Sequence, residues 1–439
     1  MSSIPKKTIM VIGGVVIVLV LFFVLLFSCI IPGLNSCSVG PQKITADLTM
    51  WGVGDTPDTY KDIIANFGKS YPEVKVVYRS FSNENEYGNA LLEALATNQG
   101  PDIFEVKNNQ ISEQYNKIAP LPSSVLPLIQ IQNLFPRTVE ENFAPQGTVY
   151  AIPLSIDTLA LIYNRRLIDQ AAVTVPATWE DFKDVIPKLS NIGSDKKITQ
   201  AAIALGGSEK NVSHATDILS LLMLQSGTQI VSSDFKSATF ATEEGTNALN
   251  FYTQFTNART PYYTWSTSMP NSLDSFGAER TAMIIDYASA VPLIRSKNAF
   301  LDIGIAPVPQ PKAGIDRPIA YGSYWGYTVS KQSKNQDIAW RFVTAMTTNE
   351  MNADLYAQKT GKPPALSSLL KGKYLNDPKL SVFARQALIA RSWPEINARK
   401  ITQIFSDMID AVNANQATAQ MAISTAEDQV TQLMSHTAF

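Results

Sequence analysis

Length, composition and charge exclude several classes of protein. The chain has 439 residues, of which 45% are hydrophobic and 17% charged, and its formal net charge is −2. Such a chain can bury a large core and has no basic excess for binding nucleic acid. Its two cysteines and two histidines are too few for a disulfide framework or for most zinc and histidine chemistry, so we expect no cofactor and no metal site.

The first segment is an apolar run over residues 9–31, preceded by two lysines within residues 1–8. A helix of about 23 residues is long enough to cross a bilayer, whereas a secretory signal has an apolar region of about 7–15 residues. The run therefore predicts an uncleaved transmembrane anchor, with residues 1–8 in the cytoplasm and the body on the extracytoplasmic side of the cell membrane.

Two cysteines leave a second interpretation of this segment open. The residues before Cys29 and before Cys37 resemble the lipobox of lipoproteins, so lipidation at one of them is the alternative to the anchor. Residues 32–45 are small, polar and proline-containing, which is typical of a linker. Under both interpretations the body is tethered to the outer face of the membrane.

The body opens with alternating strand and helix patterns. In chain order they predict a strand over residues 48–53, a helix from Pro57, a strand over 74–78, a helix over 87–95 and a strand over 102–106. This alternation indicates parallel strands with helical crossovers. Ligands of such sheets bind beyond the carboxyl ends of the strands, where polar residues follow each predicted strand here.

The remainder of the body continues this mixture. Residues 150–164 are strongly apolar but contain Asp157, and Thr178 with Asp181 forms a capping-box-like helix start. Later patterns predict strands over 283–285, 303–306 and 325–329, and helices around 248–255, 338–346 and 401–412. Residues 218–224 are an apolar helix or another buried segment. About 400 residues are too many for one compact core, so we expect two lobes.

Five short sequence motifs occur in a fixed order along the body. They are residues 48–52 with 67–77, residues 100–104, residues 150–164 with 176–182, residues 276–283 with 305–309, and residues 330–335 with 339–342. In this order and spacing they resemble the extracellular solute-binding protein family 1, the group that contains the maltose-binding protein. The resemblance covers nearly the whole body, residues 44–433.

The resemblance implies an α/β fold of the two-lobe, periplasmic-binding-protein-like type II class. Each lobe would be a mainly parallel sheet flanked by helices, and crossover strands would form a hinge. The implied boundaries are residues 46–156 and 325–375 for lobe 1, and residues 157–324 and 376–439 for lobe 2.

Candidate ligand-binding residues are chosen for sugar chemistry, which uses aromatic faces against sugar rings and planar polar groups or carboxylates for hydroxyls. The candidates are Asp55, Asn108, Asn109, Asp157, Asp286, Tyr287, Tyr324, Trp325, Trp265 and Trp393. By resemblance, Asp55 follows the first strand at a polar contact position, Asn109 lies near an acidic position of the maltose-binding relative, and Asp157 matches a sugar-binding carboxylate.

Each candidate also has a structural interpretation. Asp55 could cap the following helix, the two asparagines could form a turn, and Asp157 could form a salt bridge at the hinge. The aromatic candidates could pack in the core. The maltose-binding relative has an aromatic residue near Ser289, where only Tyr287 is aromatic here.

The function that the resemblance implies is an extracytoplasmic solute-binding protein of an ABC importer. It would bind a sugar or oligosaccharide between the lobes and deliver it unchanged to membrane permease subunits, acting as a monomer and not as an enzyme. Alternatives are another solute on the same fold (a peptide, polyamine or phosphate ester), a receptor for a sensor kinase, or a surface glycoside hydrolase, which needs two carboxylates about 5–9.5 Å apart.

Overall fold

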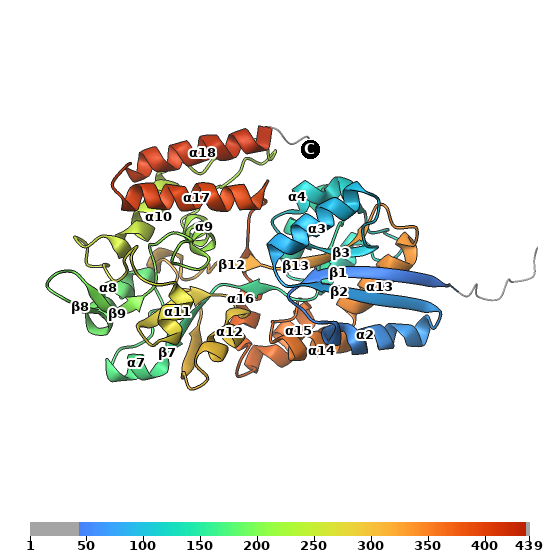
Figure 1. Ribbon diagram of the computed structural model, residues 1–439, viewed down its shortest axis with the longest axis horizontal. Helices are drawn as coiled ribbons and strands as arrows, with labels where there is room; N and C mark the ends of the chain where they lie inside the picture. Colours follow the sequence, from blue (N-terminus) through green and yellow to red (C-terminus); the bar gives the residue numbers. More distant parts are fainter. Residues whose placement is uncertain (1–43, 436–439) are drawn as a thin grey trace, which may run out of the picture. The chain divides into compact units, whose positions relative to one another are not determined.

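The computed structural model describes residues 44–435. The predicted anchor over residues 9–31, together with Cys29 and Cys37, lies outside the described residues. Within residues 44–435 no helix combines the length and the hydropathy that crossing a membrane requires. Residues 46–435 form one compact unit, which contains two main sheets and a small third one (Figure 1).

The first main sheet has the strand order β2-β1-β3-β13-β4, with β5 also paired to β13. Its strands are β1 (Ala46–Val53), β2 (Val74–Phe81), β3 (Ile103–Lys107), β4 (Ile118–Ala119), β5 (Ile152–Pro153) and β13 (Trp325–Ser330). The predicted alternation is confirmed, because α2 (Pro57–Ser70) and α3 (Glu84–Ala96) connect β1, β2 and β3, and β1 pairs with both neighbours in parallel.

Helices cover both faces of this sheet (Figure 1). α3 and α4 (Ile111–Gln114) contact one face, whereas α2 and α13 (Gln336–Thr348) contact the other, with α14 (Glu350–Thr360) packed on α2. The remaining helices around this sheet are α5 (Leu128–Leu134), α6 (Arg137–Phe143), α15 (Ser367–Lys371) and α16 (Ser381–Ala387).

The second main sheet has the order β11-β7-β10-β9-β8. Its strands are β7 (Ala160–Asn164), β8 (Asn191–Ile192), β9 (Ile198–Ile203), β10 (Thr281–Asp286) and β11 (Ile303–Ala306). Its helices are α7 (Arg165–Gln170), α8 (Phe182–Leu189), α9 (Ala215–Gln225), α10 (Glu243–Thr253), α11 (Ser272–Gly277), α12 (Ala290–Lys297), α17 (Ala398–Asn413) and α18 (Ala419–Ser435). The predicted capping box of Thr178 and Asp181 is present before α8.

The prediction of mainly parallel sheets is wrong, because both sheets are mixed. In the first sheet β13 runs antiparallel to β3, β4 and β5. In the second, β7 runs antiparallel to β10 and β11, and only β9 and β10 are parallel. The reason is topological. β7 and β13 each enter a sheet directly from the other half of the molecule, so they run opposite to strands that return through helices.

A three-stranded sheet links the two halves. Its order is β14-β12-β6, formed by β6 (Asp157–Thr158), β12 (Ala320–Ser323) and β14 (Ala390–Arg391). Each strand belongs to one passage of the chain between the halves, and the three passages are therefore hydrogen-bonded to one another. We call this element the linking sheet.

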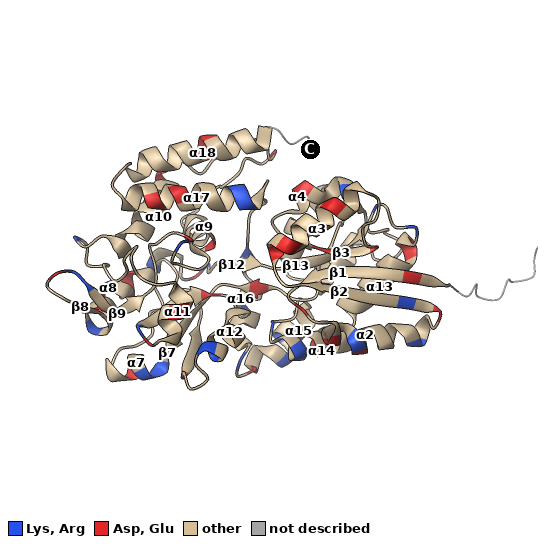
Figure 2. Cartoon of the chain, in the orientation of Figure 1, with Lys and Arg blue, Asp and Glu red and all other residues tan. Residues whose placement is uncertain are grey.

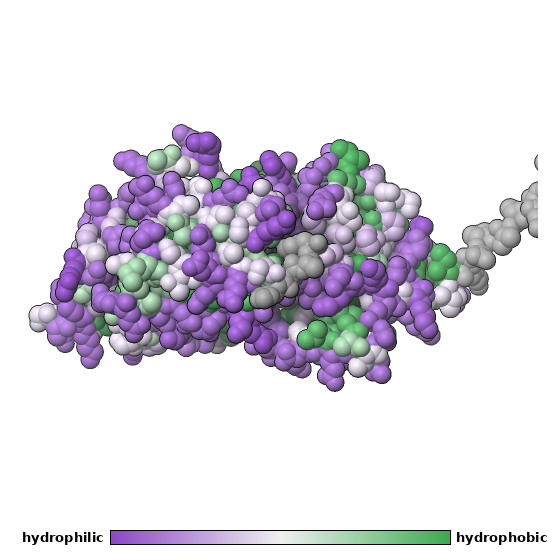
Figure 3. All heavy atoms as spheres, turned by 90° about the horizontal axis from the view of Figure 1, so that it is seen from above, coloured by the Kyte–Doolittle hydropathy of each residue, from purple (hydrophilic) through white to green (hydrophobic). Residues whose placement is uncertain are grey.

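Two hydrophobic clusters accompany the main sheets. One surrounds the first sheet and includes residues of α13, α14 and α16, and the other surrounds the second sheet and includes α17 and α18. The buried residues Leu380, Phe383, Ala384, Ala387 and Ala390 pack with the first cluster, whereas Ile389 and Trp393 pack with the second. The face shown in Figure 3 is mostly hydrophilic with small, separate apolar areas, and Figure 2 shows acidic and basic residues spread over both halves.

Candidate functional site

The central cavity lies where the two main sheets meet the linking sheet, and it has a volume of about 170 Å³. The ends of β1 and β3 reach it from one side, and the turn after β10 reaches it from the other. Its lining residues are Val53, Glu84, Glu105, Lys107, Ser155, Asp157, His214, Tyr287, Ser289, Ser323, Tyr324, Trp325, Tyr327, Tyr356 and Lys362.

A larger cavity of about 630 Å³, which we call the side cavity, adjoins the central one. The two share four lining residues, Glu84, Glu105, Lys107 and Trp325. The side cavity is also lined by residues of α3, α4, α9 and the start of α17. We call both cavities together the cleft, and both halves of the molecule contribute to it.

Asp157 lies on the linking sheet and lines the central cavity, with 6% of its surface exposed. Its carboxylate accepts hydrogen bonds from the backbone N–H groups of Thr158 (2.9 Å), Ala288 (2.9 Å) and Ser289 (3.0 Å). Burial raises the pKa of Asp157, and the N–H groups of Ala288 and Ser289 oppose that rise. Among residues 44–435 no Lys or Arg forms an ion pair with it, so the salt-bridge interpretation is wrong.

Asp286 and Tyr287 follow β10 on the wall formed by the second sheet. Tyr287 lines the central cavity and donates a hydrogen bond to Asp217 (2.7 Å). Asp286 is 1% exposed and lies 3.5 Å from Nε2 of His214. Burial raises the pKa of Asp286 to about 6. Asp286 itself does not line the cavity, but it contacts His214 and Tyr287, which do.

Asn108 and Tyr324 belong to a buried network beside the linking sheet. Asn108 Nδ2 donates to Ser392 Oγ (2.9 Å) and to the Gly322 carbonyl (3.2 Å), and its Oδ1 accepts from the Tyr324 backbone N–H (3.0 Å). The Tyr324 hydroxyl donates to Asn142 Oδ1 (2.7 Å). Tyr324 also lines the central cavity, whereas the side chain of Asn108 is fully engaged in the network.

Asn109 and Trp325 line the side cavity, and Trp325 lines the central cavity as well. The turn predicted at the asparagines is present, because Gln110 N–H bonds to the Lys107 carbonyl (2.9 Å). Trp325 is half-buried and packs edge-on against Tyr87, with ring centroids 5.9 Å apart. An aromatic face at this position is suited to a sugar ring.

Asp55 is held in an ion pair. Its carboxylate accepts from Lys362 Nζ (2.9 Å), Tyr356 Oη (2.6 Å) and Tyr60 Oη (2.9 Å). The capping interpretation is wrong, because Thr56 is the N-cap of α2 and no side chain caps that helix. Burial opposes the charge on Lys362, but Tyr356 and Asp55 raise its pKa above the ordinary value. Asp55 therefore holds Lys362, which lines the central cavity, in position.

Trp265 and Trp393 pack in the cluster around the second sheet. Trp265 is 0% exposed, and Trp393 is 3% exposed and stacks on Phe405 with ring centroids 5.8 Å apart. Neither residue lines the central or the side cavity. The structure therefore groups Asn109, Asp157, Tyr287, Tyr324 and Trp325 around the cleft and places these two tryptophans away from it.

Sequence reasoning missed several ionisable residues of the cleft. Glu105 is 3% exposed within β3, accepts from the Val53 backbone N–H (2.8 Å), and has its pKa raised by burial to about 7. An acidic residue inside an apolar strand is the same signal that singled out Asp157. Glu395 and Lys362 follow or precede prolines in loops, where no such pattern marks them.

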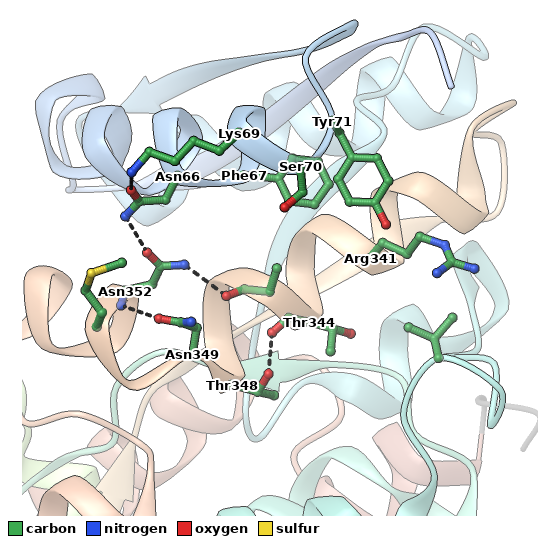
Figure 4. Close-up of a pocket in the computed structure, with 13 residues that line it drawn as sticks. Asn66, Phe67, Lys69, Ser70, Tyr71, Arg341, Thr344, Thr348, Asn349 and Asn352 are labelled. Atoms are coloured by element: carbon green, nitrogen blue, oxygen red, sulfur yellow. Dashed lines mark hydrogen bonds between the residues drawn. The ribbon is translucent and has the colours of Figure 1, made fainter. Parts of the chain in front are cut away.

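A third groove lies on the outer side of the first sheet, between α2 and the pair α13–α14 (Figure 4). Its polar side chains mostly bond to one another, as in the bond from Asn66 Nδ2 to Asn352 Oδ1 (3.0 Å) and that from Asn352 Nδ2 to the Ala345 carbonyl (3.0 Å). It contains no residue from the second sheet or the linking sheet. We therefore place the candidate site in the cleft.

Residues 54–353 match the family described as bacterial extracellular solute-binding protein. The chain belongs to this family. The match begins just after β1 and ends within α14, so it includes the whole second sheet of this solute-binding protein and every strand of the first sheet except β1. Members of the family are binding proteins of transport systems, and its description places them outside the cytoplasm.

Two curated relatives share the sequence of this solute-binding protein over most of the body. The maltotriose-binding protein of Pyrococcus abyssi is 24% identical over 329 residues, which cover 74% of this chain and 67% of the relative. The multiple sugar-binding protein of Streptococcus mutans is 21% identical over 326 residues, which cover 72% of this chain and 74% of the relative.

Solved structures share its fold. The GacH receptor of Streptomyces glaucescens has a TM-score of 0.71 at 20% identity, with 90% of this chain and 100% of that chain covered. The sugar-binding protein MalE of Xanthomonas citri has a TM-score of 0.73 at 18% identity, with 88% and 97% covered.

Proposed function

We propose that the protein is the solute-binding component of an ABC importer, tethered on the extracytoplasmic side of the membrane. It holds a sugar or oligosaccharide in the cleft and delivers it to membrane permease subunits without chemical change. The two main sheets with their helices are the two lobes, and the linking sheet is the hinge between them.

The arrangement around Asp157 carries this proposal. A carboxylate on the linking sheet lines a cavity that both sheets border, beside the half-buried face of Trp325 and the hydroxyl-bearing ring of Tyr287. Carboxylates bind sugar hydroxyls with charge-assisted hydrogen bonds, and aromatic rings pack against the apolar face of a sugar. The names of the two relatives, which refer to maltotriose and to multiple sugars, support a saccharide as the solute.

The test is isothermal titration calorimetry of the purified chain with maltotriose, raffinose and arabinotriose, together with mass spectrometry of each solute after incubation. We expect at least one saccharide to bind and to be recovered intact. Absence of binding to every saccharide would refute a sugar as the solute, and a hydrolysed product would refute transport without chemical change.

A pair of tryptophan variants locates the site. Trp325→Leu removes an aromatic face from the cleft, whereas Trp51→Leu changes a half-buried tryptophan that packs on Phe81 and Arg79 in the same sheet and lines neither cavity. We expect Trp325→Leu to weaken saccharide binding and Trp51→Leu to leave it unchanged. Equal losses in both variants would contradict the proposed position of the site.

A further inference from the structure

His214 is the one histidine within residues 44–435, and it lines the central cavity. It lies directly before α9, and its side chain is 43% exposed. Its backbone has φ 58° and ψ 30°, a left-handed conformation that residues other than glycine adopt uncommonly and keep where the surrounding structure holds them. His214 therefore has a defined place on the wall of the cleft, although it is not among the residues assigned to the sugar.

The imidazole of His214 lies between two carboxylates. Its Nε2 is 3.5 Å from Asp286 Oδ1, and its Nδ1 is 3.7 Å from Asp217 Oδ2. Neither carboxylate has an ion pair with a Lys or Arg in the described part of the chain. A neutral imidazole has one N–H donor and can serve one of them, whereas an imidazolium has two donors and a positive charge and can serve both.

Both carboxylates also bind Tyr287. The Tyr287 hydroxyl donates to Asp217 Oδ2 (2.7 Å), and its backbone N–H donates to Asp286 Oδ1 (2.7 Å). These are the same two oxygens that face His214. The imidazole packs edge-on against the Tyr287 ring, with centroids 4.7 Å apart. The histidine and the two carboxylates therefore surround a tyrosine that lines the central cavity.

The turn after Tyr287 holds the carboxylate to which we assign the sugar. Ala288 and Ser289 follow Tyr287 and donate their backbone N–H groups to Asp157 (2.9 and 3.0 Å). A shift of Tyr287 would therefore move two of the donors of Asp157. In this way Tyr287 connects the charge on His214 to the binding carboxylate.

We propose that His214 is a positioning residue for solute binding, and that its charged imidazolium fixes Tyr287 and the turn after it in the arrangement that binds the solute. Loss of the proton leaves the carboxylate of Asp286, which is 1% exposed, without a cation, and an unpaired buried charge is costly. The cleft then binds its solute more weakly. This inference rests on the proposed function, because it concerns the same cleft and the same binding carboxylate.

Other ionisable groups surround this arrangement. Those that face His214 or its two carboxylates from neighbouring elements are Glu209 before α9, Asp157 on the linking sheet, Tyr321 on β12, Lys107 on β3 with its partner Glu84, and Glu395 before α17. Lys107 is the one cation among these groups, and it already lies 3.4 Å from Glu84 Oε1. The imidazolium is therefore the charge that can balance Asp217 and Asp286.

The titration of these groups sets the direction of the pH dependence. Burial raises the pKa of Asp286 to about 6, and the charge of His214 opposes that rise. From about pH 6.5 upward Asp286 is mostly ionised, and imidazoles lose their proton between about pH 5 and 8. Raising the pH through this range removes the imidazolium while the carboxylate stays charged. Because the solute-bound arrangement favours the charged imidazole, affinity falls as the pH rises, and binding takes up protons.

The experiment is calorimetry of the full chain with maltotriose, raffinose and arabinotriose at about pH 6.5 and about pH 8.5, on either side of the loss of the imidazole proton. For each saccharide that binds, we expect the Kd at the higher pH to be at least about fivefold above that at the lower pH. Titrations at about pH 7.5 in two buffers with different heats of ionisation should show proton uptake on binding.

The variant His214→Asn removes the titrating ring, and asparagine tolerates the left-handed backbone. The ratio of the two Kd values should fall to about one in this variant. His436→Asn is the matched control, because it makes the same chemical change at the other histidine of the chain, which lies outside the described residues, and it should keep the ratio.

Two carboxyls of the cleft are the competing source of such a pH dependence. Burial raises the pKa of Glu105 to about 7 and that of Glu395 to about 8. Glu105→Gln and Glu395→Gln therefore enter the same titrations. A ratio that disappears in either of these variants and persists in His214→Asn would refute the role of His214.

A measurement without solute tests the positioning itself. Hydrogen exchange reports the protection of the Ala288 and Ser289 N–H groups. At about pH 6.5 their protection should fall in His214→Asn, because the turn has lost its cation, whereas the amides of α13 should keep theirs. Thermal melting reports separately whether the variant is folded.

The outcomes separate the two proposals. If a saccharide binds equally well at both pH values, or if His214→Asn keeps the ratio, the inference is refuted and the proposed function stands. If no saccharide binds but the protection of the turn falls in His214→Asn, the proposed function is refuted and the positioning of the turn by His214 stands. Unchanged protection in His214→Asn would refute the inference in either case.

Discussion

Replacing Asp157 by Asn tests the role of this carboxylate. Oδ1 accepts from the Thr158 and Ala288 N–H groups, and Oδ2 accepts from Ser289. The asparagine oxygen can keep the first pair, but its NH₂ group would then face the Ser289 N–H group. One hydrogen bond to a charged group is lost and one buried donor is left unpaired, which costs about 1–3 kcal/mol of folding free energy.

The same change removes a charged acceptor from the central cavity. If Asp157 accepts a hydroxyl of the solute, losing the charge costs about 1.5–3 kcal/mol of binding free energy, or roughly a 10- to 150-fold rise in Kd. Urea unfolding measures the first effect and calorimetry with the bound saccharide measures the second. Asp286→Asn is the comparison, because Asp286 is equally buried but does not line either cavity. A Kd that changes no more in Asp157→Asn than in Asp286→Asn would refute the reasoning.

Three further predictions concern other groups of the cleft. Lys362→Met leaves Asp55 buried without its cation, so it should lower the free energy of unfolding by about 3–5 kcal/mol in urea titrations. Adding Asp55→Asn to this variant should recover much of that loss. An unchanged urea midpoint in Lys362→Met would contradict a stabilising role for the ion pair. Because burial raises the folded-state pKa of Glu105 to about 7, its contribution to stability is complete below about pH 4 and is lost as the pH rises through about 7. Glu105→Gln should flatten the decline of the unfolding midpoint across that range, and a parallel decline would argue against it. Trp325→Ala should abolish the fluorescence change on saccharide binding, because Trp325 lines both the central and the side cavity; a response that persists at full amplitude would place the solute elsewhere.

Local patterns in the sequence predicted much of the first sheet. An apolar stretch predicted β1, alternating residues predicted β2, and Pro57 predicted the start of α2. Strand direction beyond β3 was not predictable in this way, because β7 and β13 take their direction from a passage between the halves and not from a local crossover. The residues of α16 similarly show no local sign that they pack with the first cluster, since that depends on the partners that folding brings to them.

The candidate site was predictable where a residue contradicts its surroundings. Asp157 interrupts an apolar run, and in the structure three backbone N–H groups donate hydrogen bonds to its buried carboxylate. Glu395 and Asp217 lie far apart in the sequence and become neighbours of one cavity only through the docking of the α17 start beside α9. Tryptophan in a polar or proline-flanked context was a poor guide, because Trp265 and Trp393 are surrounded by other side chains of the second cluster.

The linking sheet has a mechanical consequence. Because β6, β12 and β14 share ladder hydrogen bonds, one strand cannot bend while the other two stay straight. Any change in the angle between the halves must then be a concerted flexing of all three strands about a common axis. Sliding or twisting apart would shear those ladders, so the two walls of the cleft can separate and return while keeping their register.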